Sequence, residues 1–334
     1  MQYRQLGDSD LQVSVVVFGA WAAGGWMWGG IDDEEVVRAM RAAVEAGSTT
    51  LDTAPIYGFG HSERLVGEAI RGMRDRVILA SKCCLRWDTE EGELYFRTKF
   101  EGRSYDIHKL LSKESIKWEC EQSLARLGVE TIDLYQCHWE DPTTPLEETM
   151  EALVELREEG KIRAIGVSNF SPANIRKCRE LGNLASNQPR YNPLRRDIEA
   201  EVLPVCRDLN VGILAYSPLE HGLLSGKLTK DRKFKGDDLR RNHPWTQRGN
   251  RGRLIQVMEH IEEIAHEYSA TPAQVVINWV LSEPGITAAI VGARTEKQAR
   301  ENADAARFEM AESHRADVRR LFENLGEPKK RLLG

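Results

Sequence analysis

The segment LDTAPIYGFGHSE, residues Leu51–Glu63, passes from a strand-like run through a short loop into a helical run. Its first residues belong to the buried-strand pattern TTLDTA, which Asp52 interrupts, and Tyr57 follows among small residues. A helical pattern, SERLVGEAIRG, begins at Ser62, a residue type that often caps a helix. The segment is therefore read as one strand–loop–helix unit that places a carboxylate and a phenol where the strand ends.

The same unit recurs along the chain. The predicted strands are VVVFGA, TTLDTA, VILASK, IDLYQCHW, IRAIGVSN, LASNQPRY, VGILAYSP and ITAAIVGA. Between them lie helical patterns such as DDEEVVRAMRAAVEAG and SKESIKWECEQSLARLG. Strands that alternate with helices indicate βαβ crossovers and a parallel sheet. About eight units in one chain predict an α/β fold, the (β/α)8 TIM barrel, with a doubly wound open sheet as the competing architecture. YRQLG and LQVSV at the N-terminus predict a β-hairpin that plugs one end.

Two segments exceed a minimal barrel unit. DTEEGELYFRTKFEGRSYDIH follows the third strand and is read as polar and irregular. EHGLLSGKLTKDRKFKGDDLRRNHPWTQRGNRG follows the seventh strand and is long and basic. Loops of such length are usually functional or disordered, and in a barrel both would lie at the C-terminal ends of the strands, where active sites sit. Because neither segment resembles a linker, residues 1–334 are expected to form one domain.

Composition excludes several classes of protein. The 334 residues carry a net charge of -6, which argues against a nucleic-acid-binding surface. Six cysteines without a paired spacing predict neither a zinc site nor a disulfide framework, and they favour a cytoplasmic protein. Cys83 and Cys84 follow Lys82, whose charge could make them redox-sensitive; buried, inert thiols are the favoured alternative.

The uncharged stretch Val13–Ile31 is nearly long enough to span a membrane. Glycine fills much of its second half, and no signal-peptide features frame it. We therefore read it as a buried strand, Val15–Ala20, which opens into a loop rich in glycine and tryptophan.

Four polar residues stand at or just after predicted strand ends, namely Asp52, Tyr57, Lys82 and His138. Each alone is ordinary as a cap, surface or core residue, but together they suit acid–base chemistry. A lysine ammonium near a phenol lowers the phenol's pKa, and a carboxylate holds the lysine in place. A histidine can orient a substrate carbonyl. The pattern predicts that Asp52 holds Lys82, that Lys82 tunes Tyr57, and that Tyr57 exchanges a proton with a carbonyl oxygen.

Several motifs together resemble the aldo-keto reductase family over about residues 3–322. They are LDTAPIYGFGHSE, LASK, DLYQCHW, GKIRAIGVSNF, YNPL, GILAYSPLEHGLLSGK and IVGARTEKQAREN. WMWGG and GDDLRRN point to the bacterial general stress protein 69-like branch, which is NADPH-dependent. The resemblance implies a TIM barrel, hydride transfer between a nicotinamide and a carbonyl, and a catalytic tetrad at Asp52, Tyr57, Lys82 and His138.

The resemblance also implies a binding site for NADP(H). The positions that match cofactor contacts are Gly19, Trp21, Ser168, Asn169, Gln188, Tyr216, Ser217, Leu219, Gly222, Ser225, Lys227, Gly292, Arg294, Gln298 and Asn302. Tyr216 matches the aromatic that stacks on the nicotinamide. Many members have Lys-Ser where this chain has Gly292-Ala293, so one phosphate partner is missing, and Arg294 is expected to replace it.

The substrate pocket is predicted from aromatic residues near strand ends, with ordinary packing as the alternative for each: Trp21, Trp28, Phe59, Trp87 and Trp139. The leading function is an NADP(H)-dependent reductase of small-molecule aldehydes, ketones or sugars. Alternatives are a sugar or polyol dehydrogenase working in the oxidative direction, a slow nucleotide-binding redox sensor and, more weakly, a metal-dependent hydrolase. No metal, nucleic acid or membrane partner is expected, and the chain could be a monomer or a homo-oligomer.

Overall fold

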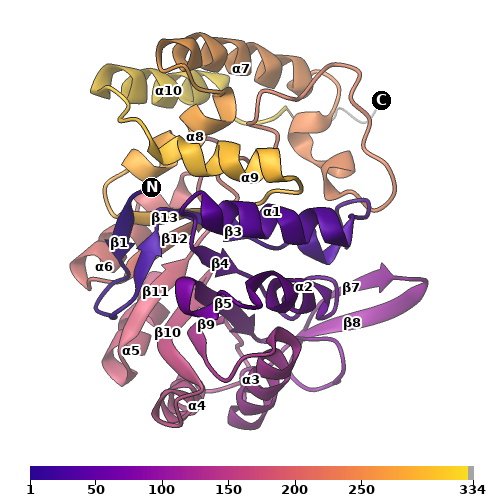
Figure 1. Ribbon diagram of the computed structural model, residues 1–334, viewed down its shortest axis with the longest axis vertical. Coiled ribbons are helices and arrows are strands. Elements are labelled where there is room, and N and C mark those ends of the chain that lie inside the picture. Colours follow the sequence, from indigo (N-terminus) through magenta and orange to yellow (C-terminus); the bar gives the residue numbers. More distant parts are fainter. Residues whose placement is uncertain (330–334) are drawn as a thin grey trace.

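The computed structural model describes residues 1–329, and its centre is a closed barrel of eight parallel strands (Figure 1). In chain order, each strand pairs with the next, and the last pairs with the first. The strands are β3 (Val16–Gly19), β4 (Thr50–Asp52), β5 (Ile78–Cys83), β9 (Ile132–Cys137), β10 (Ile162–Ser168), β11 (Leu184–Gln188), β12 (Gly212–Tyr216) and β13 (Ile286–Val291). The predicted (β/α)8 barrel is confirmed, and the open sheet is excluded.

Helices surround the barrel and bury their apolar faces against it. They are α1 (Asp33–Glu45), α2 (His61–Ile70), α3 (Lys113–Leu127), α4 (Leu146–Glu158), α5 (Pro172–Leu181), α6 (Val202–Asp208), α8 (Pro272–Ser282) and α9 (Glu296–Ala303). Their starts are set by local sequence: Asp32 and Ser171 accept hydrogen bonds from backbone N–H groups of the first turn, and Thr271 forms a reciprocal capping box with Gln274.

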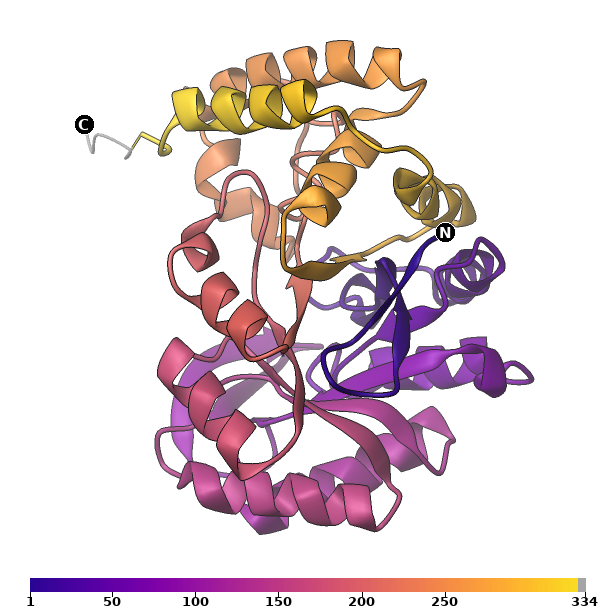
Figure 2. The same ribbon diagram turned by 90° about the vertical axis from the view of Figure 1, so that its left-hand side faces the viewer.

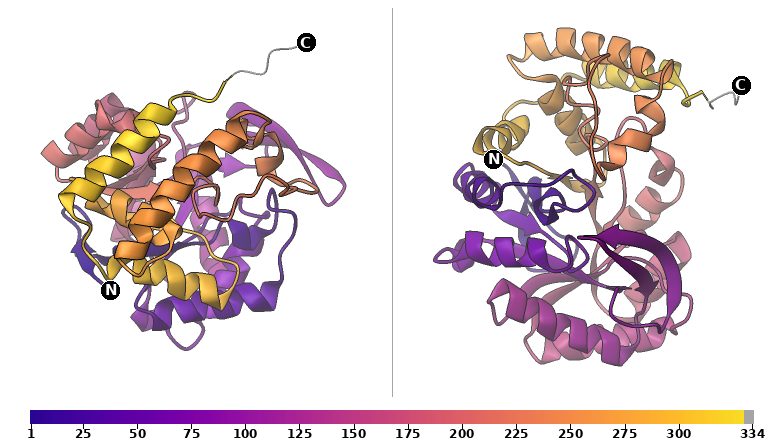
Figure 3. Two further views of the ribbon diagram at one scale, coloured as in Figure 1. Left: turned by 90° about the horizontal axis from the view of Figure 1, so that it is seen from above. Right: turned by 90° about the vertical axis from the view of Figure 1, so that its right-hand side faces the viewer.

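Two helices lie outside this ring. Figure 2 shows α7 (Asn250–Glu267) and α10 (Glu312–Leu325) side by side at one end of the molecule, and the view from above in Figure 3 agrees. They pack on each other and on α8, so they thicken the wall beside the last strands without entering the barrel.

The N-terminal hairpin closes one end of the barrel. Strands β1 (Tyr3–Gln5) and β2 (Gln12–Ser14) pair in antiparallel register. Leu6 and Leu11, at the turn, are fully buried in a cluster with the small side chains that fill the barrel interior, such as Ala164 and Ala288. The predicted plug therefore exists, and it leaves the opposite, C-terminal end of the strands for a site.

The segment after β5 differs from its prediction. Residues read as polar and irregular form a regular three-stranded antiparallel sheet, β6 (Leu85–Arg86), β7 (Glu93–Phe100) and β8 (Arg103–Lys109), in the order β6-β8-β7. The long hairpin β7–β8 projects from the barrel (Figures 1 and 3). From Phe96 to Phe100, exposed polar residues alternate with half-buried ones, and this one-sided solvation explains why the segment was read as polar.

The segment after β12 is long, as predicted. It holds only the short 3-10 helices Leu239–Asn242 and Pro244–Thr246 before α7 begins. Ser217, Glu220 and His221 adopt positive φ angles of 54°, 45° and 57°, which turn the chain tightly above the barrel. Among residues 1–329, no helix is both long and apolar enough to cross a membrane, and the stretch Val13–Ile31 contains β3 as expected.

Candidate active site

Asp52 and Lys82 form a buried ion pair at the end of the barrel. Both lie in the last residues of adjacent strands, β4 and β5, so the parallel register brings their side chains together. Lys82 Nζ donates to Asp52 Oδ1 at 2.6 Å and to the carbonyl oxygen of Thr53 at 2.9 Å. The lysine side chain is fully buried. The expected contact between these two residues is therefore present.

Tyr57 and His138 complete the group, which we call the barrel-end cluster: Asp52, Tyr57, Lys82 and His138. Lys82 Nζ lies 3.4 Å from the Tyr57 hydroxyl oxygen. The Tyr57 and His138 rings meet edge to face, with centroids 5.7 Å apart. The four side chains thus converge on one point at the C-terminal end of the strands, which is where a barrel presents its reactive groups.

The pKa values in the barrel-end cluster differ from the expectation that Lys82 lowers the pKa of Tyr57. Burial, with a smaller contribution from the charge of Asp52, raises the pKa of Tyr57 well above its ordinary value. Burial also lowers the pKa of Lys82, while Asp52 opposes that shift. The predicted lowering of the Tyr57 pKa is therefore not found for the protein alone. Burial and the nearby Lys82 charge lower the pKa of His138 well below its ordinary value. At neutral pH the phenol keeps its proton and the imidazole is neutral.

Two glutamines support Asp52 from the barrel interior. Gln188 and Gln136 both donate from Nε2 to Asp52 Oδ2, at 2.8 Å and 3.2 Å. Gln188 also donates to Gln136 Oε1 at 3.2 Å. Sequence reasoning missed Gln136 and assigned Gln188 to a cofactor contact, although its amide nitrogen is engaged with Asp52 here. The position of Gln136 near the end of strand β9 was the one sequence feature that could have indicated a role for it.

A cavity of about 530 Å³ opens in front of Tyr57 and His138. The predicted cofactor positions Gly19, Trp21, Ser168, Asn169, Gln188, Tyr216, Ser217, Leu219, Gly222, Ser225, Lys227, Gly292, Arg294, Gln298 and Asn302 all line it. Several polar side chains that line the cavity are held by hydrogen bonds to one another. Asn169 donates from Nδ2 to Ser168 Oγ at 2.9 Å, and the Tyr216 hydroxyl donates to Asn169 Oδ1 at 3.1 Å.

The predicted substrate residues divide into two groups. Trp21, Trp28 and Trp139 line the cavity, whereas Phe59 and Trp87 do not. Phe59 and Trp87 pack edge to face at 5.4 Å beneath the hairpin β7–β8, so they support a wall of the cavity instead of forming it. The ordinary-packing alternative describes these two residues.

The hairpin β7–β8 supplies aromatic residues that sequence reasoning missed. Tyr95 and Phe96 line the cavity, and the Tyr95 ring lies 5.4 Å from that of Trp139. Because the segment was read as irregular, its aromatic residues had no predicted direction. A regular strand would place these neighbours on opposite faces, but the β7–β8 register shifts between Leu94 and Phe96, and both side chains reach the cavity at this irregularity.

A charged group at the same cavity is called the arginine cluster: Arg232, Arg240, Arg294 and Asp238. The three arginines line the cavity. Asp238 is engaged by Arg240, with Arg240 Nη2 2.6 Å from Asp238 Oδ2. The guanidinium groups of Arg240 and Arg294 lie over the Trp28 ring at 5.4 Å and 5.7 Å. Three positively charged side chains beside one carboxylate leave a net positive charge, which favours the binding of an anion. Only Arg294 was predicted, because loop residues carry no strand-end signal.

Cys83 and Cys84 are both fully buried, as the favoured alternative predicted. Burial raises the pKa of each thiol well above its ordinary value, with the neighbouring acidic groups adding to the effect at Cys84. Thiolates are the reactive form of cysteine, so this environment opposes redox chemistry at either residue.

Comparison with known proteins agrees with this architecture. The family model described as "Aldo/keto reductase family" matches residues 15–323. The chain is 37% identical over 327 residues to aldo-keto reductase YhdN of Bacillus subtilis (strain 168), covering 97% of this chain and 94% of that protein. It is 36% identical over 331 residues to the NADH-specific methylglyoxal reductase of Escherichia coli (strain K12), covering 97% and 99%.

Among solved structures, the glycerol dehydrogenase AKR11B4 from Gluconobacter oxydans superposes with a TM-score of 0.87 at 36% sequence identity, covering 100% of this chain and 99% of that one. Strand order, the convergence of the barrel-end cluster on one cavity and these matches lead to the same conclusion. The chain belongs to the aldo/keto reductase family of oxidoreductases.

Proposed function

We propose that this protein is an NADP(H)-dependent carbonyl reductase in which Tyr57 exchanges the proton. The observation that carries the proposal is the geometry of the barrel-end cluster, where a protonated phenol faces a cavity beside a buried lysine. When bound, the nicotinamide supplies the hydride that the carbonyl carbon accepts. The protein then has to bind both partners, exclude water and deliver one proton.

The cavity residues fit a dinucleotide phosphate. Ser168, Asn169 and Tyr216 form a connected polar floor beside the barrel-end cluster, and they would hold the nicotinamide end. The arginine cluster gives part of the same cavity an excess of positive charge, and it would hold the 2′-phosphate. Planar guanidinium groups suit phosphate oxygens. Gly292 leaves open space in the cavity, since a Cβ there would meet only the Gly19 carbonyl oxygen, at 3.4 Å.

In the direction of reduction, the Tyr57 hydroxyl donates its proton to the carbonyl oxygen as negative charge develops there. The Lys82 ammonium, 3.4 Å from the hydroxyl oxygen, stabilises the phenolate that remains. Asp52 keeps that ammonium charged and fixed. The neutral His138 ring has one N–H group, which orients the carbonyl through a hydrogen bond. In the oxidative direction the same groups act in reverse.

Proton transfer by Tyr57 is tested by Tyr57→Phe, which removes the hydroxyl and keeps the ring. Aldehyde reduction with NADPH should fall by at least about a hundredfold, the lower range for a positioned acid. NADPH affinity, measured by fluorescence titration, should change by less than about twofold. A variant that kept more than about a tenth of wild-type turnover would remove Tyr57 from the role.

A polyol dehydrogenase that works mainly in the oxidative direction is the second candidate. It is favoured by the similarity to the glycerol dehydrogenase AKR11B4 from Gluconobacter oxydans. Paired assays with glycerol and NADP+ and with glyceraldehyde and NADPH, each repeated with the non-phosphorylated nucleotide, separate the two directions and the two nucleotides. Faster turnover with NADH than with NADPH would contradict the proposed nucleotide preference.

A further inference from the structure

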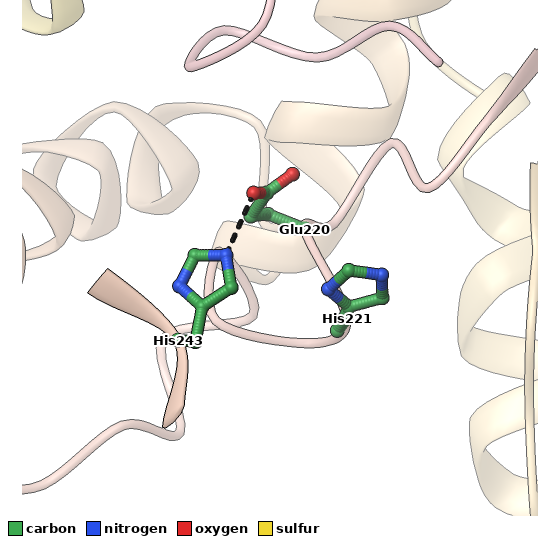
Figure 4. Close-up of side chains that lie close together, drawn as sticks. All are labelled: Glu220, His221 and His243. Atoms are coloured by element: carbon green, nitrogen blue, oxygen red, sulfur yellow. Dashed lines mark hydrogen bonds and ion pairs between the residues drawn. The ribbon is translucent and has the colours of Figure 1, made fainter. Parts of the chain in front are cut away.

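Some buried polar side chains take no part in the mechanism proposed above. One group of them, Glu220, His221 and His243, lies in the segment after β12 (Figure 4). The carboxylate already has donors: Oε1 accepts from Arg190 at 2.6 Å and from His243 at 3.0 Å, and Oε2 accepts from Asn192 at 2.7 Å. These contacts fasten loops to one another, and the Arg190 guanidinium would repel a divalent cation there. A different group, behind strand β5, is connected more closely to the chemistry.

The chain turns sharply at Cys84, directly after β5. This residue has a φ angle of 105°, which residues with a side chain rarely adopt and which glycine adopts freely. Cys84 is fully buried, and its carbonyl oxygen accepts a hydrogen bond from the backbone N–H of Leu110 at 3.0 Å. A strained backbone of this kind persists only where its surroundings hold it. The groups that contact Cys84 therefore decide whether the turn keeps its shape.

The turn at Cys84 links the ends of β5 and β9, where two residues of the barrel-end cluster lie. Lys82 comes two residues before Cys84. The backbone N–H of His138 donates to the carbonyl oxygen of Cys83 at 3.0 Å. The Cys84 thiol donates to the carbonyl oxygen of Trp139, a residue that lines the cavity, at 3.5 Å. A change in the path of this turn would therefore shift Lys82 and His138 relative to each other.

Glu119 in helix α3 holds the N–H side of this turn. Its Oε1 accepts a hydrogen bond from the backbone N–H of Cys84 at 3.0 Å. The residue is buried, and Ser115 Oγ donates to the same oxygen at 3.4 Å. Arg86 Nη1 in turn donates to Ser115 Oγ at 2.8 Å. A side chain of the surrounding helices thus supports a strained backbone at the end of a barrel strand.

The Glu119 carboxyl group acts as a neutral acceptor. Burial raises its pKa to about 8, although the hydrogen bond from Cys84 and the charge of Arg86 oppose the shift. At pH 7 the group is therefore predominantly protonated. Its other oxygen, Oε2, is buried and has no hydrogen-bond partner among residues 1–329. Because Oε1 can accept a hydrogen bond in either protonation state, the support of the turn does not depend on the charge.

We propose that Glu119 is a positioning residue for the reaction, because its hydrogen bond fixes the strained turn at Cys84. That turn sets the positions of Lys82 and His138 relative to each other. Glu119 itself does not line the cavity, so it acts on the chemical step without contact to substrate or cofactor. The inference rests on the proposed carbonyl reductase function, since it concerns the same catalytic groups.

Two substitutions of Glu119 test the hydrogen bond. Glu119→Leu leaves the Cys84 N–H without its acceptor, and the kcat for glyceraldehyde reduction with NADPH should fall about tenfold, since a displacement of about 1 Å can cost about a hundredfold. The Kd for NADPH should change less than about twofold. Glu119→Gln, which keeps a neutral acceptor, should stay within about twofold of the wild type in both measurements. Glu114→Leu, at an exposed position of the same helix, is the control.

A second change at Cys84 tests the strain. Glycine adopts a φ angle of 105° without a steric penalty, so a turn with Cys84→Gly should no longer need the acceptor. The double variant Glu119→Leu/Cys84→Gly should therefore recover most of the kcat that Glu119→Leu loses. Glu119→Leu/Cys84→Ala is the matched comparison, because alanine also removes the thiol but keeps the Cβ atom, and it should not recover. If Glu119→Leu alone does not fold, glycine and not alanine at position 84 should restore folding.

An equal loss of kcat in Glu119→Gln and Glu119→Leu, or no loss in either, would overturn the role of Glu119. The same follows if glycine and alanine at position 84 have the same effect, or if NADPH affinity falls in parallel with kcat. A wild type that does not reduce glyceraldehyde would instead contradict the proposed function. The coupling is then measured by thermal unfolding, in which Cys84→Gly should raise the Tm of Glu119→Leu more than that of the wild type. Equal shifts would refute the proposal.

Discussion

The barrel-end cluster and the arginine cluster lie at the same cavity, and they are built differently. In the first, one lysine is matched by one aspartate, both are buried, and both end adjacent barrel strands. In the second, three arginines accompany one carboxylate, which Arg240 contacts directly, and the guanidinium groups of Arg240 and Arg294 lie over a tryptophan ring in a loop.

The difference in charge balance and burial suits the two clusters to different functions, proton transfer and anion binding. A balanced, desolvated pair holds protons in defined places, because water and outside charges do not reach it. An unbalanced group near the surface attracts an anion and stays sensitive to salt. Changes in the barrel-end cluster should therefore affect the chemical step, and changes in the arginine cluster should affect nucleotide binding.

The largest effect is expected for Lys82→Met. The substitution removes the cation next to the Tyr57 hydroxyl and leaves Asp52 buried without its charged partner. Turnover of aldehydes should fall at least about a hundredfold, while the Kd for NADPH changes little. Lys99→Met, in the hairpin, is the control. A variant with weak nucleotide binding and normal turnover at saturation would reverse the assignment of tasks.

His138→Ala should be less uniform. Its proposed role is orientation of the carbonyl, so the loss should vary between substrates, in contrast to the even loss in Lys82→Met. A panel of aldehydes and ketones assayed with both variants gives the comparison. The same mild loss in both variants, for every substrate, would contradict this division of roles.

A smaller effect is expected in the arginine cluster. Arg294→Ala and Arg240→Ala should each raise the Kd for NADPH by about ten- to a hundredfold, as for a hydrogen bond to a charged group, and leave the Kd for NADH nearly unchanged. Arg248→Ala is the matched control, because it is an exposed arginine of the same segment. Equal weakening of both nucleotides would show that the cluster does not recognise the 2′-phosphate.

The smallest effect concerns pH. The Tyr57 pKa is raised, so the phenol keeps its proton until the pH exceeds 10, and the His138 pKa is lowered, so the ring stays neutral until the pH is well below 6.5. We therefore expect kcat/KM for aldehyde reduction at saturating NADPH to be nearly constant from about pH 6.5 to pH 9. A sigmoidal fall within this range would show that one of these groups titrates there and that the cluster is less isolated than its burial indicates.

The sequence predicted the barrel-end cluster well because the C-terminal ends of all strands in a parallel barrel lie at the same end of the barrel. Asp52, Lys82 and His138 each end, or directly follow, a recognisable apolar run, so their convergence followed from the fold. Gln136 ends a strand too, but an amide without a charge gave no reason to select it.

The loops were less predictable. Arg232 and Arg240 reach the cavity through a path set by positive φ angles and side-chain stacking, which no short-range pattern encodes. Tyr95 and Phe96 could not be predicted because a shift in the β7–β8 register, which no short sequence pattern indicates, brings two adjacent side chains to the cavity. The positions of Phe59 and Trp87 were predicted wrongly because an aromatic residue after a strand can pack behind a cavity wall as readily as it can line the cavity.

The N-terminal plug has a consequence for the order in which the molecule can assemble. Strand β3 pairs with β13, and Arg4 Nη1 donates to the carbonyl oxygen of Ile286 at 2.7 Å. The hairpin and β3 therefore find these partners only after the intervening part of the barrel has been synthesised. Until then Leu6 and Leu11 have no closed barrel to enter, and apolar surface stays available to chaperones or to other nascent chains.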